Sequence, residues 1–198
     1  MIAAEARKTL DTDAITQLQI DCVARWHVEE IANPYEGFLQ LVCQQHEHNY
    51  RLWHEEDIAR SPSVTDTEIA GVKRRIDKLN QARNDMIEQL DDAITDLLAE
   101  CSVLPFSEAP INTETAGSAI DRLSIMSLRL YHYEEQMQRT DVDQTHLQKV
   151  ADRIDLCRIQ HTDLTLSLCQ LLDDLFAGVK KHRTYRQMKM YNDPSLNP

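Results

Sequence analysis

The chain has 198 residues, a formal net charge of −12, and only four glycines and six prolines. At this length one domain can bury roughly 70% of the surface that its unfolded chain exposes, so the core requires neither disulfides nor a structural metal. The acidity argues against general nucleic-acid binding, because phosphates would be repelled. No apolar run approaches the roughly 20 residues that cross a bilayer, and the N-terminus lacks a secretion signal. We therefore expect a cytoplasmic protein without a membrane span.

The cysteines support the same compartment. They are odd in number and far apart, and no CxxC pair occurs. Free cysteine among apolar neighbours behaves as a small hydrophobe, and unpaired cysteines are typical of a reducing environment. The five positions are Cys22, Cys43, Cys101, Cys157 and Cys169.

Long stretches without glycine or proline predict an all-α fold, in a single domain over 1–198. The first helix should stop before Pro34, because proline disfavours helix in the preceding residue. Thr65 with Glu68, or Ser63 with Asp66, forms a capping box that opens the third helix. The fourth starts near Thr115 or Ser118, with Ser118 and Asp121 as its cap. We expect an antiparallel up-and-down bundle of about five long helices, with a short basic tail. Their ranges are about 13–31, 35–60, 65–100, 115–139, and from the turn at 140–143 to about 179.

The third and fifth expected helices carry the clearest amphipathic stripes. Apolar residues recur there at spacings of three and four, as in a helix packed lengthwise against neighbours. Each stripe has one gap, filled by Arg83 in the third helix and by His161 in the fifth. The apolar face of the second helix turns polar through Gln45, Asn49, Glu56 and Arg60.

These polar interruptions predict a site. Burying an unpaired guanidinium or carboxylate costs several kcal/mol, so such groups need partners. We expect Arg83, His161, Glu56, Asn49 and Asp57 to meet in one interior or cleft-lining network. The alternative is purely structural, because polar residues in a bundle seam often only fix register.

Several chemistries find little support. The chain has no ExxH motif for a di-metal bundle; only reversed pairs occur, at His27/Glu30, His54/Asp57 and His132/Glu135, which we attribute to chance. A magnesium-dependent pyrophosphatase would require ExxE pairs, which are absent. A chorismate-mutase-like enzyme would hold a dicarboxylate with arginines in an interior pocket, and only the helix that contains Arg83 is similar to such an enzyme. No nucleophile elbow or phosphate loop is present. We expect no metal site and no cofactor.

The last 20 residues, 179–198, carry a net charge of +4, against −16 for the rest of the chain. We expect this tail to pack on the acidic body, with Tyr185, Met188 and Tyr191 as its docking face. RNA could bind such a segment through phosphate contacts and stacking. The acidic body counts against that use.

Three segments together carry a resemblance: LWHEEDIAR at 52–60, ETAGSAIDRLSI at 114–125 and YRQMKMYNDPSLNP at 185–198. They resemble a bacterial family known as domain of unknown function family 4254, over nearly the whole chain. The resemblance implies an all-helical bacterial protein of this length but supplies no activity. It also hints at genes of sugar transfer in cell-surface polysaccharide synthesis.

The leading hypothesis is a polar pocket between the second, third and fourth helices that binds a small polar or anionic ligand. A carboxylate or a histidine is the least demanding general base there. The roles we expect are anion binding by Arg60, Arg83 and Arg122, orientation or acid–base catalysis by Glu56, Asp57 and Asp121, and wall contacts by Asn49, Trp53 and His54. The sequence does not decide whether catalysis occurs. The alternative is a non-catalytic module that docks a protein partner or a second copy through a helix face or the tail.

Overall fold

The computed structural model describes residues 2–188 and 195–196. Over these residues the chain is all-α, and it forms five long helices preceded by one short helix. They are α1 (Ala3–Lys8), α2 (Thr12–Trp26), α3 (Gly37–Ala59), α4 (Asp66–Glu100), α5 (Ala116–Met137) and α6 (Gln144–Phe176). The expected all-α bundle is therefore confirmed. None of the helices in the described part of the chain combines the length and apolarity needed to cross a membrane.

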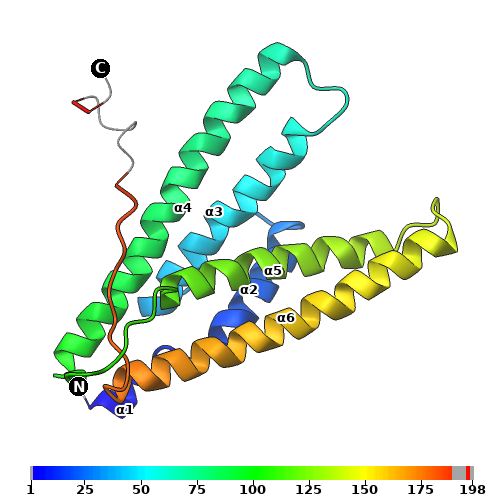
Figure 1. Cartoon of the computed structure of the whole chain (residues 1–198). Helices are drawn as coiled ribbons and strands as arrows, with labels where there is room; N and C mark the ends of the chain where they lie inside the picture. The colour runs from blue at the N-terminus through cyan, green and yellow to red at the C-terminus, as the bar shows by residue number, and fades with distance from the viewer. Residues whose placement is uncertain (1, 189–194, 197–198) are drawn as a thin grey trace.

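Two helical hairpins make up most of the molecule. α3 packs mainly on α4, α5 packs mainly on α6, and α2 contacts α3, α5 and α6. The two hairpins lie close together near α1 and spread apart from there. Their helix axes therefore cross at an angle and do not run side by side along their whole length (Figure 1). This divergence leaves polar side chains of α3, α4 and α5 facing one another around the crossing.

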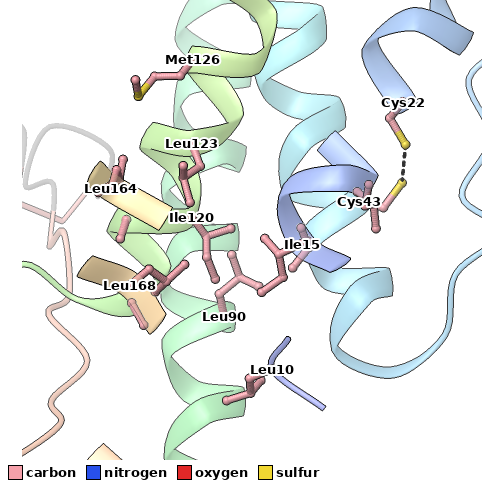
Figure 2. Close-up of a cluster of buried hydrophobic side chains, with 14 of the residues drawn as sticks. Leu10, Ile15, Cys22, Cys43, Leu90, Ile120, Leu123, Met126, Leu164 and Leu168 are labelled. Carbon is pink, nitrogen blue, oxygen red and sulfur yellow. Dashed lines mark hydrogen bonds between the residues drawn. The ribbon is translucent and has the colours of Figure 1, made fainter. Parts of the chain in front are cut away.

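The core lies where α2 and the two hairpins meet. Leu10, Ile15, Leu90, Ile120 and Leu168 are fully or nearly fully buried there, and Figure 2 shows their side chains converging. The stripe of α6 behaves as its spacing predicts, since Val150, Ile154, Cys157, Leu164, Leu168, Leu171 and Leu175 are all buried.

Local capping sets several boundaries. Of the two expected candidates, Thr65 and Glu68 form both hydrogen bonds of the capping box at the start of α4, whereas α5 is capped by Thr115, which accepts from the Ser118 N–H, and not by Ser118. One expectation was wrong, because α2 ends at Trp26 and not at Ile31. Side chains take two of its last carbonyls: His27 Nδ1 lies 2.7 Å from the Val23 oxygen, and Tyr50 Oη donates to the Trp26 oxygen at 2.9 Å. These contacts satisfy the helix end before the proline is reached.

The basic segment after α6 lies along α4 (Figure 1). The Lys181 backbone bonds to Pro110, and the His182 ring lies 2.9 Å from the Asp91 carbonyl oxygen. Arg186 forms salt bridges with Glu88 and Asp92. The expected docking face was wrong at the two positions that can be judged, since Tyr185 is 43% and Met188 is 83% exposed. Its third position, Tyr191, lies outside the described residues.

Candidate functional site

A buried polar network occupies the crossing of α3, α4 and α5. Its centre is the carboxylate of Asp121 on α5, whose two oxygens both bind the guanidinium of Arg83 on α4. Two amides of α3 also donate to Asp121 Oδ1, that of Gln45 at 2.6 Å and that of Asn49 at 3.0 Å. A carboxylate with four donors is well compensated for its loss of water. The gap in the α4 stripe is therefore filled by an arginine with a buried partner.

The network continues along α3 and α5 through Ser124. The Asn49 amide donates to Ser124 Oγ at 2.9 Å, and His46 Nδ1 lies 2.7 Å from the same oxygen. His46 is completely buried, and its ring stacks on Trp26. Burial lowers the pKa of His46 to about 3, so the ring is neutral at physiological pH. This end of the network is therefore a fixed hydrogen-bonded framework.

An open pocket of about 380 Å³ lies above the Arg83–Asp121 pair, between α3, α4 and α5. Its position follows from the polar face of α3, which meets α4 at Arg83 and α5 at Ile125 and Leu128. Six of the residues expected in the site line it. They are Asn49, Trp53, Glu56, Asp57, Arg60 and Arg83.

The charges in this pocket are nearly balanced. Arg83 is committed to Asp121, and Arg60 pairs with Glu56 one turn earlier on α3, at 2.8 Å. Asp57 is exposed and makes no salt bridge within the described residues. The lining thus offers carboxylate, amide and guanidinium groups together, and its two carboxylates and two guanidinium groups balance in charge.

Three expectations about the network differ from the structure. Arg122 points elsewhere: it forms a salt bridge with Glu114 and lines a second pocket, of about 530 Å³, together with Asp163 of α6. His161 lies apart from Arg83, in a pocket between α2, α5 and α6. Asp121 is only 4% exposed and lies behind Arg83, so it does not face the pocket as a free acid–base group. Successive residues on a helix point about 100° apart, which separates Arg122 from Asp121.

His54 also leaves the expected pocket and joins two other histidines. It lies on α3, His132 lies on α5, and His27 directly follows α2. One nitrogen of each ring lies within 4.8 Å of the others, so this group could hold a metal ion. Burial lowers the pKa of His54, and the neighbouring His27 and His132 lower it further.

Sequence reasoning missed some members of the polar network around Asp121 and of the three-histidine cluster. His46 and Ser124 gave no signal, because each belongs to a face of its helix that is apolar on average. His27 and His132 did give one, as parts of the reversed pairs, but spacing within one helix does not show which helices meet. Gln45 was visible as the first polar residue on the face of α3.

With the fold and site described, the chain can be placed among known proteins. It is an all-α two-hairpin bundle with a polar crossing. The family model described as "Protein of unknown function (DUF4254)" matches residues 39–184, and the chain belongs to that family. No curated protein and no solved structure matches it.

Proposed function

We propose that the protein binds a small polar ligand in the pocket between α3, α4 and α5, which we call the crossing pocket. The observation that carries the proposal is the lining itself: six polar or aromatic residues from α3 and α4 surround about 380 Å³ of open space. Concave sites with a few convergent polar groups are the usual places for small ligands.

The charge balance favours a neutral, hydroxyl-bearing ligand over a strong anion. Arg83 uses Nε and Nη2 on Asp121, which leaves Nη1 to donate into the pocket. Asp57 and Glu56 accept hydrogen bonds from hydroxyl groups, and the Trp53 ring supplies an apolar wall. A sugar presents this combination of hydroxyls and apolar faces. A sugar ligand would also fit a link to cell-surface polysaccharide synthesis, at which the family resemblance hints.

Within this proposal Asp121 is a positioning residue, and Asp57 and Glu56 are the carboxylates that a ligand can touch. If a reaction takes place, Asp57 is the general base of choice because its carboxylate is exposed at the pocket. We also place the protein in the cytoplasm. Cys22 and Cys43 are free thiols buried in the core, with their Sγ atoms 3.9 Å apart in a hydrogen bond (Figure 2), and free thiols suit a reducing compartment.

A thermal-shift screen tests the proposal, because a ligand that binds only the folded state raises the melting temperature. The panel contains neutral mono- and disaccharides, phosphorylated sugars and sugar nucleotides, all with EDTA present. Asp57→Asn should reduce the shift given by the best compound. Glu114→Gln is the matched control, since it removes a carboxylate from the other pocket. An equal shift in wild type and Asp57→Asn, or no shift with any compound, would contradict the proposal.

Self-association through α6 is the second candidate. Leu156, Ile159 and Leu166 are 55%, 60% and 58% exposed, and their spacing places them near one face of α6. Two antiparallel copies of α6 could cover this face for each other, because an isologous interface uses the same patch twice. Sedimentation velocity would detect the dimer, and Leu156→Glu with Ile159→Glu should dissolve it. A monomer at all concentrations would exclude this function.

A further inference from the structure

The three histidines near the ends of α2, α3 and α5 form a compact cluster. Their ring centroids lie 5.2 Å apart for His27–His54, 5.2 Å for His27–His132 and 5.7 Å for His54–His132. The ligand nitrogens lie within 4.8 Å of one another. Around a zinc ion with Zn–N bonds of 2.0–2.1 Å, nitrogens in tetrahedral geometry would be about 3.4 Å apart. The rings must therefore move closer by up to about 1.4 Å when a metal binds.

Each of the three rings has a buried Nε2 atom that finds no hydrogen-bond partner among the described residues. A buried polar atom left unpaired usually costs about 1–3 kcal/mol, so native proteins seldom keep one without a reason. Here the three rings that carry such atoms gather at one place, from the end of α2, from α3 and from α5. His46 and His161 also have an unpaired Nε2, so the clustering of three such rings, and not the unpaired nitrogen alone, is what a shared ligand would explain.

The opposite nitrogens of two rings fix which atom carries the proton. His27 Nδ1 lies 2.7 Å from the Val23 carbonyl oxygen, and His132 Nδ1 lies 2.7 Å from a Glu135 carboxylate oxygen. Carbonyl and carboxylate oxygens accept hydrogen bonds, so Nδ1 donates in both rings and the neutral imidazole holds its lone pair on Nε2. Metal-binding histidines usually have such an acceptor on the second nitrogen, because it orients the ring and increases its basicity.

Aromatic side chains hold the rings in place from the outside. Trp53 stacks on His132 at 4.9 Å with an interplanar angle of 6°, and Tyr131 stacks on His27 at 4.1 Å. Tyr50 meets His54 edge-on at 4.5 Å. A preorganised ligand set inside an apolar shell strengthens metal binding and limits the access of water.

We propose that His27, His54 and His132 bind a divalent transition-metal ion through their Nε2 atoms, with zinc as the metal that fits best. Three imidazoles suit Zn²⁺, and a three-histidine set leaves the fourth tetrahedral position for water or another ligand. His54 and Tyr50 also line a pocket of about 530 Å³ between α3 and α4, which gives solvent and ions a route to the edge of the cluster. This site does not depend on ligand binding in the crossing pocket, although Trp53 forms a wall of both.

Metal titration of the full chain, stripped with EDTA and then dialysed free of it, tests the site. Zn²⁺ is added in competition with a chromophoric chelator, and Co²⁺ is added for its visible spectrum. We expect one ion per chain and a rise in melting temperature with the metal. His54→Gln and His132→Gln should each weaken Zn²⁺ binding by more than 100-fold and abolish the thermal shift.

Two controls separate this site from adventitious binding by histidine. His161→Gln alters another half-buried histidine with an unpartnered Nε2, outside the cluster, and should leave the Zn²⁺ affinity unchanged. Glu135→Gln removes the carboxylate behind His132 and should weaken binding roughly 10–100-fold, whereas Glu134→Gln, next to it in sequence and paired with Arg158, should not.

X-ray absorption on the Co²⁺ or Zn²⁺ form of the wild type gives a readout that does not depend on how the variants fold. Three imidazole ligands are expected. Absence of tight binding by the wild type, fewer than two imidazoles at the metal, or an equal loss in His161→Gln and His54→Gln would each overturn the proposal.

Discussion

The guanidinium of Arg83 on α4 holds both carboxylate oxygens of Asp121 on α5, and this pair joins the two helical hairpins where they cross. The side chain of Asp121 is 6% exposed and that of Arg83 is 23% exposed. The pair is therefore largely shielded from water, and each member depends on the other for compensation. This relationship leads to the first prediction.

Arg83→Leu should lower the free energy of unfolding by about 3 kcal/mol, because it leaves a buried carboxylate without its counterion. Arg122→Leu removes an exposed salt bridge with Glu114, one position after Asp121. It should change the free energy of unfolding by less than about 1 kcal/mol. Urea denaturation of both variants measures the difference.

A double substitution separates charge from packing. Arg83→Leu combined with Asp121→Asn removes both charges but keeps an acceptor for the Gln45 and Asn49 amides. It should recover more than about 1 kcal/mol of the loss, since neighbouring residues are not additive. Equal stability of the double and the Arg83→Leu variants would show that the buried charge is not the cause.

Stability should also depend on pH through His46. Burial lowers the pKa of its ring to about 3, whereas an unfolded chain protonates histidine near pH 6.5. Because the folded-state pKa is lowered, the contribution of His46 to the free energy of unfolding is fully present above pH 6.5. It is lost progressively as the pH falls toward 3, since only the unfolded chain takes up the proton there.

The expected loss is about 2 kcal/mol at pH 5 relative to pH 7, from roughly 1.4 kcal/mol per pH unit. His46→Gln removes the titration, so the stability difference between wild type and variant should shrink by this amount over the same range. Urea denaturation at both pH values, with EDTA present, measures it. A constant difference would refute the assignment.

The start of α5 requires glycine at position 117. A Cβ atom there would lie 2.6 Å from the Ile87 carbonyl oxygen and 2.9 Å from Asp91 Oδ1, which accepts the Gly117 N–H at 2.7 Å. Gly117→Ala should therefore lower stability by about 1–3 kcal/mol through overpacking of α4 against α5.

Gly71→Ala is the matched control, because its Cβ would meet only the Arg75 guanidinium, at 3.6 Å. Alanine favours the helix over glycine, so this variant should be more stable by up to about 1 kcal/mol. Thermal melts of both variants give opposite signs if the close approach of α4 and α5 is correct. A neutral Gly117→Ala would disprove it.

The docked basic segment gives a fourth prediction. Arg186 pairs with Glu88 and Asp92, and it lowers the pKa of the Asp92 carboxyl. Arg186→Gln should return that pKa toward its usual range and speed hydrogen exchange at the Gln187 amide, which donates to Glu88. NMR titration and exchange measure both effects.

Arg183→Gln is the control for the segment, since Arg183 is exposed and carries the same charge. If the segment docks through Arg186 in particular, Arg183→Gln should change neither the pKa of Asp92 nor the exchange rate of the Gln187 amide. If both substitutions release the segment equally, its attachment depends on net charge and not on the two carboxylates of α4.

Much of the fold was predictable because its causes are local. The Thr65–Glu68 box was visible in the sequence as one of two candidates, and the start of α5 was visible near Thr115, since capping acts over three residues. Spacings of three and four likewise identified the buried face of α6. The end of α2 was not predictable, because Tyr50 of α3 takes part in satisfying its last carbonyls.

The candidate site was only partly predictable. Arg83 was identified because a cation interrupted an apolar stripe, and any such cation requires a buried partner. The sequence placed Asp121 among the groups that orient the arginines. It could not show that Arg83 would be its partner while Arg122, one position later, would turn to Glu114. That outcome depends on how α5 is rotated about its axis against α4.

The sequence by itself determined the long helices, their caps and the faces that they bury, because these follow from contacts between residues three or four positions apart. Only the tertiary structure decided which polar residues come together. His27, His54 and His132 are separated by 27 and 78 positions, and no local pattern links them. They meet because the crossing of the two hairpins, with α2 packed between them, brings three helix ends to one point.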